Sequence, residues 1–287
     1  LLQSLQKGRP ARSVYTLASI FSGIWLAGCA LLTVSFLSSL QAVMEELGEP
    51  YEIIVVDDGS QDETPLVLTF LQEMIPELVS LRFDMNHGQS AAFDAGFRTS
   101  RGEILITLDA DGQNPPSEIP RLIKALGFYD MVCGWRSNRQ DGWSRRYASK
   151  FANTIRRWIL KDGIHDSGCS LKAFRRHTVA RLPLFHGMHR FFPALVQIQG
   201  FSVTEVRVRH FARKAGTSHY GVLNRFWGPM CDLFMVRWMQ IRNRPWRLLN
   251  VPRELPEEHR VMDDNWPRSV QVTRRLHETP QKSVVSL

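Results

Sequence analysis

The chain has 287 residues, 44% of them hydrophobic, which is enough for one large α/β domain with appendages or for two small domains. Its formal net charge of +8 is unevenly spread, because residues 44–130 hold 17 acidic and 5 basic side chains whereas residues 136–176 hold 11 basic and 3 acidic. This pattern fits a site that binds a metal together with an anion, and it also fits a nucleic-acid surface. The four cysteines show no CxxC spacing, which argues against a zinc site or a disulfide framework.

Near the N-terminus, residues 13–44 contain no charged side chain. The run is long enough to span a bilayer, and basic residues precede it while glutamates follow it. A signal peptide is a second interpretation, and a buried helix or pair of strands is a third. The pattern therefore leaves open whether residues 13–38 cross a membrane or fold into the domain.

From residue 38 to residue 136, the pattern alternates between helices and strands. Helices are predicted at residues 38–48, 64–75, 86–100 and 115–126. Strands are predicted at residues 51–58, 78–83, 102–112 and 129–136. This alternation predicts an α/β fold with a mostly parallel central sheet flanked by helices.

Beyond residue 136 the pattern becomes more helical. A basic helix is predicted at residues 144–160, a late strand within residues 200–212, and an amphipathic helix rich in Trp, Phe and Met at residues 221–242. From about Arg244 the chain is polar and contains prolines, so we expect a disordered tail.

The third predicted strand runs into two carboxylates, in the segment GEILITLDADGQNPP at residues 102–116. Asp109 and Asp111 repel each other unless a cation lies between them. A calcium-binding EF-hand loop does not fit, because positions 6 and 12 counted from Asp109 are Asn114 and Pro120 instead of Gly and Glu. The pair suits Mg²⁺ or Mn²⁺ held by few protein ligands, with open positions for substrate phosphates.

A second acidic pair, Asp57 and Asp58, follows the first of these strands. Turns of the Asp-Gly-Ser type are common, so this signal alone is weaker. At a strand end, however, the carboxylates can accept hydrogen bonds from a nucleobase or ribose. Ligands of parallel sheets bind beyond the carboxyl ends of the strands, so we expect both acidic pairs to line one site.

Four segments resemble a known family in their order and spacing. They are YEIIVVDDGSQDET at residues 51–64, NHGQSAAFDAGFRTSRGEILITLDADGQNPP at 86–116, HDSGCSLKAFRR at 165–176 and RHFARKAGTSHYG at 209–221. Together they resemble family 2 glycosyltransferases of the polyprenyl-phosphate type, which include dolichyl-phosphate mannosyltransferases and bacterial undecaprenyl-phosphate glycosyltransferases. The resemblance covers roughly residues 39–244. It implies the GT-A fold, a UDP- or GDP-sugar donor, and inverting transfer to a polyprenyl phosphate in cell-envelope glycan biosynthesis.

The resemblance also implies a role for each matching position. The nucleotide would be contacted by Asp57, Asp58 and Asp109. The metal and the donor diphosphate would be held by Asp109, Asp111 and Gln113. Catalysis would depend on Asp111, Arg136 near the transferring phosphates, Asp166 at the sugar end of the pocket and Arg213. The lipid phosphate and diphosphate would be bound by Arg136, His210, Arg213, Ser218 and Tyr220.

One part of the family pattern is missing. Members normally begin with a strand and turn of the type VVxPxYNE, whereas here the uncharged residues 13–38 stand in that place. Either the sheet lacks its first strand or the apolar segment substitutes for it. The missing motif supports a second hypothesis, in which the chain is a non-catalytic relative that binds a membrane or a partner.

Taken together, the sequence predicts an enzyme divided into four parts. Residues 1–38 form an atypical apolar segment, 39–220 the catalytic domain, 221–244 an amphipathic membrane-proximal helix, and 245–287 the polar tail. Because nucleotide sugars are cytosolic, we expect the enzyme on the cytoplasmic face of a membrane, with helix 221–242 on an anionic lipid surface or docked on the core. Nucleic acid is not an expected partner, since the chain has no recognised binding module.

Overall fold

The computed structural model describes residues 15–21, 28–136, 143–211 and 224–243, all within one compact unit that ends at Asn243. Its strands are β1 (Tyr15–Phe21), β2 (Tyr51–Asp57), β3 (Leu78–Arg82), β4 (Ile104–Asp109), β5 (Met131–Trp135), β6 (Lys172–Arg175) and β7 (Val203–Arg207). Its α-helices are α1 (Gly28–Leu47), α2 (Thr64–Met74), α3 (Gln89–Thr99), α4 (Ile119–Leu126), α5 (Trp143–Leu160), α6 (Arg176–Val179), α7 (Phe192–Ile198) and α8 (Asn224–Arg242). Two short 3₁₀ helices, η1 (Pro116–Glu118) and η2 (Met188–Arg190), complete the described elements.

The strands form one sheet in the order β3-β2-β1-β4-β6-β5-β7. All neighbouring strands are parallel except at β6, which is antiparallel to both β4 and β5. The mostly parallel sheet flanked by helices is therefore confirmed.

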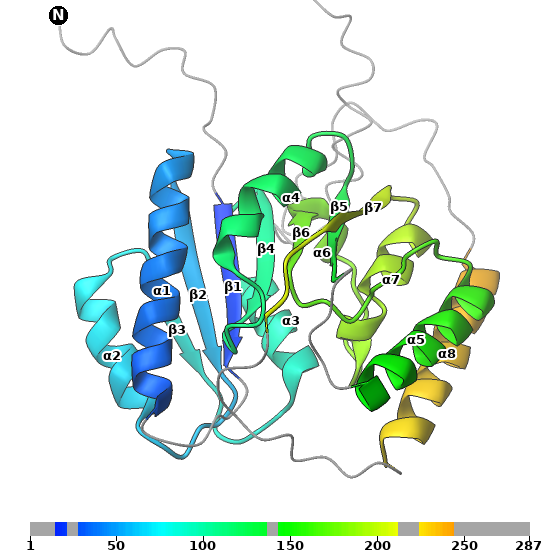
Figure 1. Cartoon of the computed structure of the whole chain (residues 1–287), viewed down its shortest axis with the longest axis horizontal. Coiled ribbons are helices and arrows are strands. Elements are labelled where there is room, and N and C mark those ends of the chain that lie inside the picture. Colours follow the sequence, from blue (N-terminus) through cyan, green and yellow to red (C-terminus); the bar gives the residue numbers. More distant parts are fainter. Residues whose placement is uncertain (1–14, 22–27, 137–142, 212–223, 244–287) are drawn as a thin grey trace, which may run out of the picture. The chain divides into compact units, whose positions relative to one another are not determined.

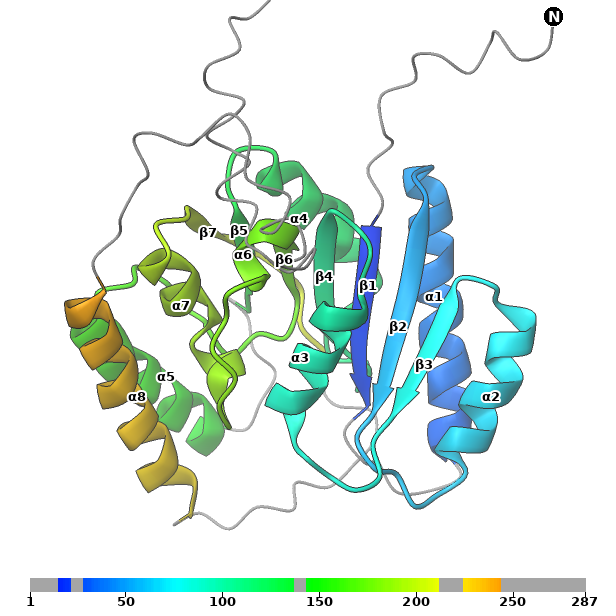
Figure 2. The ribbon, with the colours of Figure 1, turned by 180° about the vertical axis from the view of Figure 1, so that it is seen from behind.

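Helices cover both faces of the sheet (Figures 1 and 2). One hydrophobic cluster lies between the sheet and α1, α2 and α4, and a second lies between the sheet and α3, α5, α7 and α8. Strand β2 contributes to both clusters, because Ile53 and Val55 point into the first and Ile54 and Val56 into the second. This alternation follows from the two-residue period of a strand and keeps the backbone at the middle of the core.

Part of the apolar N-terminal segment is an internal strand of the sheet. Strand β1 pairs with β2 on one side and with β4 on the other, so the sheet does not lack its first strand. A parallel strand covered on both faces is a continuous apolar run without charges. For this reason its sequence resembles a membrane segment.

Helix α1 crosses the expected boundary between residues 38 and 39, and so joins the apolar segment to the domain instead of separating them. Its buried side chains Leu37, Leu40 and Met44 recur at helical spacing, and the helix ends before Gly48, whose φ of 68° lies in the left-handed region. No helix in the described parts of the chain is long and apolar enough to cross a bilayer. The tail predicted at residues 245–287 lies outside the described residues.

The region after residue 160 differs from the predicted pattern. The short strand β6 and helix α7 were not predicted, whereas the late strand and the final helix were, with β7 at Val203–Arg207 and α8 starting at Asn224. Strand β6 has four residues and carries charged side chains at both ends, so it lacks the apolar run that marks the other strands.

Candidate active site

The two acidic strand ends lie at the same edge of the sheet. Asp57 is in register with Phe21 of β1, and Asp109 is in register with Ile20 of the same strand. Two inter-strand spacings separate β2 from β4, so the two carboxylates stand roughly 10 Å apart on either side of β1. Both acidic strand ends therefore lie at one edge of the sheet.

The two members of the first acidic pair have different surroundings. The Asp58 carboxylate accepts backbone N–H groups of the facing loop, from His87 at 2.7 Å and from Gly88 at 3.0 Å. The Asp57 carboxylate accepts the Ser60 N–H at 2.9 Å through Oδ1, while its Oδ2 accepts no hydrogen bond from any described residue. Nε of Arg82 lies 3.5 Å from this Oδ2 as an ion pair, and the atom still has capacity to accept a hydrogen bond.

Gly59 brings these two loops together. Its φ of 74° lies in the left-handed region, and a Cβ atom at this position would lie 2.5 Å from the carbonyl carbon of Met85. Only glycine fits such an approach. The Asp57-Asp58-Gly59 turn is thus packed directly against the loop that precedes α3.

At the end of β4, Asp109 and Asp111 belong to a tightly bonded loop. Oδ1 of Asp109 accepts the Gln89 side-chain amide at 2.9 Å, and the Asp109 N–H donates to Ser170 Oγ at 3.2 Å. Asp111 Oδ1 accepts the N–H of Gln113 at 3.0 Å, which closes the Asp-Gly-Gln turn. Gln89 is the first residue of α3, so the positive end of that helix dipole also faces this edge.

The electrostatics of this loop fit a divalent cation. Burial and the charge of Asp111 raise the pKa of Asp109 to about 6, even though Lys172 and Arg136 act to lower it. Two carboxylates that oppose each other's ionisation are stabilised by added positive charge. Within the described residues, no group of three or more His, Cys, Asp or Glu side chains could hold a metal ion. Two carboxylates fill only part of the coordination sphere of Mg²⁺, so an ion bound by Asp109 and Asp111 would keep positions for phosphate oxygens.

On the other side of β4, Arg136 and Asp166 form a bidentate ion pair. The guanidinium donates through Nε at 2.7 Å and through Nη2 at 2.9 Å, and the backbone N–H of Arg136 donates to the same carboxylate at 3.2 Å. Only 11% of the Arg136 side chain and 6% of the Asp166 side chain are exposed. The family resemblance implied separate roles for these residues, with Arg136 near the transferring phosphates and Asp166 at the sugar end of the pocket, whereas in the structure they pair with each other.

The last motif is only partly described. His210 is buried, and its neighbour Phe211 donates its N–H to the carbonyl of Gln113 at 2.9 Å, which ties this motif to the Asp109 loop. Arg213, Ser218 and Tyr220 lie outside the described residues.

Three further side chains reach this site but were not singled out from the sequence. Lys172 of β6 is buried, donates to the Cys169 carbonyl and interacts electrostatically with Asp109. Ser170 and Gln89 bind Asp109 as described above. All three lie inside the segments that carry the family resemblance. Their position in those segments was the only indication in the sequence that they belong to the site.

His189 of η2 joins the two sides of the site. Its Nδ1 lies 3.0 Å from Oγ of Ser90 in α3, and Ser90 also accepts the Gly187 N–H at 2.9 Å. Burial of the ring, together with the charge of Arg190, lowers the pKa of His189 to about 3. The imidazole is therefore neutral at physiological pH.

Comparison with known proteins agrees with this geometry. The family model described as Glycosyl transferase family 2 matches residues 35–182, which is more than half of the chain. The chain belongs to glycosyl transferase family 2.

Two curated relatives are undecaprenyl-phosphate 4-deoxy-4-formamido-L-arabinose transferases. The one from Serratia proteamaculans (strain 568) is 38% identical over 219 residues, which cover 76% of this chain and 66% of the relative. The one from Aeromonas hydrophila subsp. hydrophila is 40% identical over 192 residues, which cover 66% of this chain and 59% of the relative. The chain thus spans less than two thirds of the length of each relative.

Solved structures confirm the GT-A fold. Glucosyl-3-phosphoglycerate synthase from Mycobacterium tuberculosis, in a complex with Mn²⁺, uridine diphosphate and phosphoglyceric acid, superposes with a TM-score of 0.58. The match covers 82% of this chain and 80% of that one at 14% sequence identity. At this identity the likeness concerns the fold alone.

Proposed function

We propose that this chain transfers a sugar, with inversion, from a nucleotide sugar to a polyprenyl phosphate, and that the reaction depends on Mg²⁺ or Mn²⁺. The observation that carries the proposal is the pair of acidic strand ends, Asp57 and Asp109, on either side of β1 at one edge of the sheet. In this proposal Asp57 contacts the nucleoside, and Asp109, Asp111 and Gln113 hold the ion with the donor diphosphate. The ion would supply charge neutralisation of the leaving diphosphate.

The remaining residues have chemistry suited to a phosphate acceptor. A phosphate monoester has a second pKa of about 6, so it is largely dianionic near neutral pH and needs no strong general base. What the site must provide is positive charge around the incoming phosphate. We propose that Arg136 and Lys172 supply this charge from within the described residues, joined by Arg213. His210, Ser218 and Tyr220 would contact the phosphates through hydrogen bonds.

Undecaprenyl phosphate is our proposed acceptor, because it appears in the names of both curated relatives. The same names make nucleotide-linked 4-deoxy-4-formamido-L-arabinose the first donor to test. A lipid acceptor places the enzyme at a membrane, and a cytosolic nucleotide sugar places it on the cytoplasmic face.

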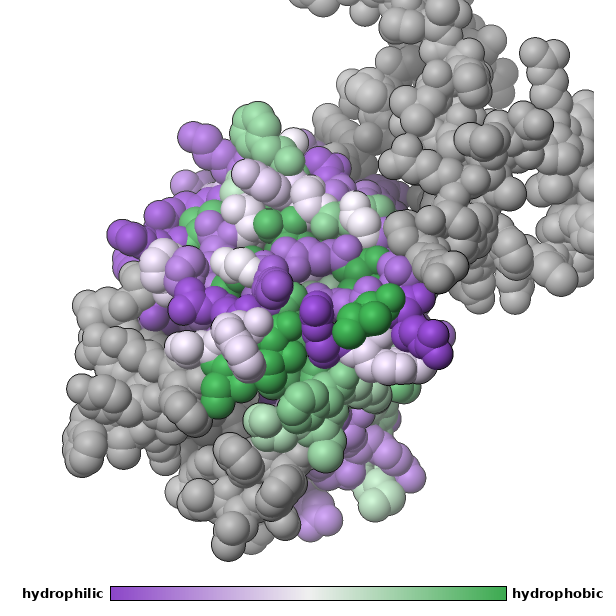
Figure 3. All heavy atoms as spheres, turned by 90° about the vertical axis from the view of Figure 1, so that its right-hand side faces the viewer, coloured by the Kyte–Doolittle hydropathy of each residue, from purple (hydrophilic) through white to green (hydrophobic). Residues whose placement is uncertain are grey.

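The outer surface of α8 and the end of α5 supports this location. On the outer face of α8, an apolar stripe of Phe234, Trp238 and Ile241 is exposed to solvent. On the neighbouring end of α5, 79% of Trp158 is exposed. Figure 3 faces this side of the molecule and shows apolar side chains among hydrophilic ones. Cationic residues flank the stripe, namely Arg157, Lys161, Arg237 and Arg242.

Charge distinguishes this surface from a second apolar stripe. Helix α2 also exposes Leu66, Phe70 and Met74, but it has no basic residue and carries Glu73. Anionic lipid headgroups attract cationic side chains and repel acidic ones. We therefore propose that the α8 surface, and not the α2 surface, meets the membrane.

The test is a donor screen with radiolabelled nucleotide sugars, Mn²⁺ and undecaprenyl phosphate in vesicles, with the extracted glycolipid as readout. We expect labelled lipid from the wild type and a strongly reduced amount from Asp111→Asn. The alternative is a relative that has lost catalysis together with the Pro-x-Tyr-Asn-Glu motif. Calorimetric titration with UDP and GDP in the presence of Mn²⁺ separates the two, since complete absence of binding would favour the alternative.

A further inference from the structure

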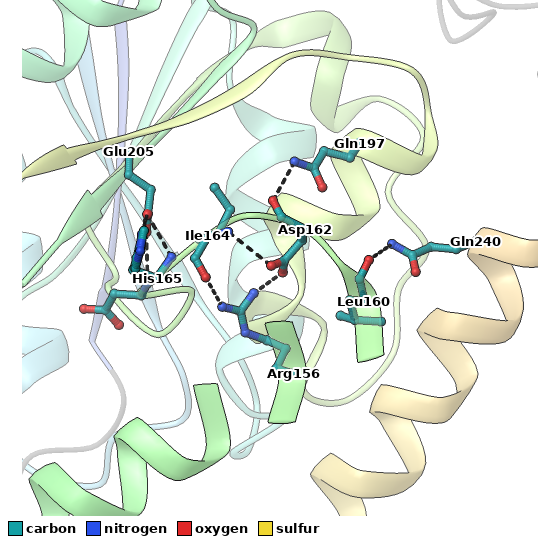
Figure 4. A network of polar contacts seen from close by, with 9 residues as sticks. Arg156, Leu160, Asp162, Ile164, His165, Gln197, Glu205 and Gln240 are labelled. Atoms are coloured by element: carbon teal, nitrogen blue, oxygen red, sulfur yellow. Dashed lines mark hydrogen bonds and ion pairs between the residues drawn. The ribbon is translucent and has the colours of Figure 1, made fainter. Parts of the chain in front are cut away.

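The loop that carries Asp166 is held by a carboxylate outside the family motifs. Glu205 lies on β7, with 9% of its side chain exposed, and points toward His165. Its Oε2 accepts the N–H of His165 at 2.8 Å, and its Oε1 accepts the N–H of Asp166 at 2.8 Å. Nδ1 of His165 also lies 2.8 Å from Oε2 (Figure 4). One carboxylate thus fixes two consecutive backbone amides and one side chain.

The same loop is fixed at its beginning. Asp162 forms a buried ion pair with Arg156 of α5 and accepts the N–H of Ile164 at 3.2 Å. Its carbonyl accepts the side-chain amide of Gln197 of α7 at 2.9 Å (Figure 4). With Asp162 at one end and Glu205 at the other, the backbone leading into Asp166 has little freedom.

The aromatic rings beside Glu205 restrict the loop further. The ring of His165 stacks on that of Trp135, with centroids 4.6 Å apart and planes at 16°. The guanidinium of Arg207 lies over the same Trp135 ring at 4.9 Å. Because Trp135 directly precedes Arg136, both the arginine and its partner Asp166 are attached to this arrangement.

We infer that Glu205 is a positioning residue for the Arg136–Asp166 pair. It touches neither side chain of the pair, but it sets the backbone from which Asp166 reaches Arg136. The bidentate geometry then orients the guanidinium, whose charge also acts on Asp109. The inference rests on the proposed function only for the consequence in catalysis, because the hydrogen bonds that define it are independent of any substrate.

The sheet offers a matched control for Glu205. Glu52 of β2 is also a buried glutamate, and its Oε1 accepts two consecutive backbone amides, from Arg101 at 2.6 Å and Gly102 at 3.2 Å. Its loop carries none of the site residues. Replacement of either glutamate by glutamine turns one acceptor oxygen into a donor, which cannot accept an N–H group.

The experiment compares Glu205→Gln with Glu52→Gln by two readouts. The first is the ¹⁵N–¹H signal of the Arg136 Nε–H group, assigned with Arg136→Lys. In Glu205→Gln we expect this hydrogen to exchange with solvent about tenfold faster, because the loop that carries its acceptor, Asp166, is no longer fixed by Glu205. In Glu52→Gln the signal should remain that of the wild type. The second is kinetic: kcat should fall about tenfold in Glu205→Gln with the donor KM unchanged, because small misplacement of a charged group acts on the transition state.

A wild-type Arg136 signal in Glu205→Gln would overturn the inference. If that variant does not fold, amide hydrogen exchange in the wild type decides instead. The inference requires the backbone amides of His165 and Asp166 to be strongly protected, and their rapid exchange would contradict it. If no protein transfers sugar, the proposed function fails, but the Arg136 signal still tests the positioning role.

Discussion

The two halves of the sheet build the site in different ways. In the parallel half, formed by β3, β2, β1 and β4, the candidate carboxylates stand directly at strand ends or in the turn that follows. In the mixed half, formed by β6, β5 and β7, Arg136 and Asp166 are held by each other and by the loop that carries Asp166. Position in the first half follows from the strands themselves. Position in the second depends on contacts between residues far apart in the chain.

The largest effect is expected in the parallel half. Asp111→Asn should lower sugar transfer by about a thousandfold, because charge stabilisation by a bound metal is worth several kcal/mol. It should also abolish the thermal stabilisation of the protein by Mn²⁺. Radiolabelled glycolipid and thermal unfolding with and without Mn²⁺ measure the two effects. Asp94→Asn, in a surface ion pair with Arg98, serves as the control. Wild-type transfer by Asp111→Asn would refute the metal role of this loop.

The parallel half was also the more predictable from sequence. Strands at residues 51–58 and 102–112 run straight into Asp57 and Asp109, so local pattern and the rule for parallel sheets place both at one edge. The exception is β1, whose charge-free sequence is shared by central strands and membrane segments. Only its hydrogen-bonded neighbours β2 and β4 distinguish them.

The mixed half was harder to predict for a physical reason. The pairing of Arg136 with Asp166 spans 30 residues, and Glu205 binds amides 39 and 40 residues before it. No local period reports such contacts. Family resemblance identified Arg136 and Asp166 but gave no indication that they neutralise each other, and Glu205 lies between two motifs without belonging to either.

A second prediction tests whether geometry, and not charge alone, matters in the mixed half. Arg136→Lys retains the positive charge but cannot form the bidentate pair with Asp166, and we expect turnover to fall roughly 30- to 100-fold. Arg157→Lys, in the half-buried last turn of α5, should have little effect. Steady-state kinetics with saturating donor measures the difference. Equal turnover of the two variants would show that Arg136 acts as a simple charge.

A third prediction compares the exposed surfaces of the two halves. Trp238 on α8 and Phe70 on α2 are each 61% exposed. We expect Trp238→Ser to weaken binding to vesicles containing anionic lipid about tenfold, because burying a large apolar side chain contributes about 1.5–3 kcal/mol. Phe70→Ser should leave binding unchanged. Co-sedimentation across salt concentrations measures both, and the wild-type affinity should fall as salt rises. Equal losses in the two variants would contradict assignment of the membrane surface to α8.

The smallest effect concerns the contact that joins the two halves, between His189 of η2 and Ser90 of α3. The folded pKa of His189 is about 3, whereas an unfolded chain protonates histidine near 6.5. Between these values the unfolded state binds the extra proton, so acidification from pH 7 to pH 5 should reduce the free energy of unfolding. The variant His189→Asn keeps a polar atom near the Nδ1 position but cannot take up a proton in this pH range. Its Tm should therefore fall less than that of the wild type between pH 7 and pH 5. The difference should be about 2–4 °C for each kcal/mol of unfolding free energy that protonation of His189 contributes. Above pH 8 His189 is essentially unprotonated in both states, so the difference in Tm between the two proteins should stay constant there. The same fall from pH 7 to pH 5 in both proteins would mean that acid acts elsewhere, and the contact between the halves would then be insensitive to pH.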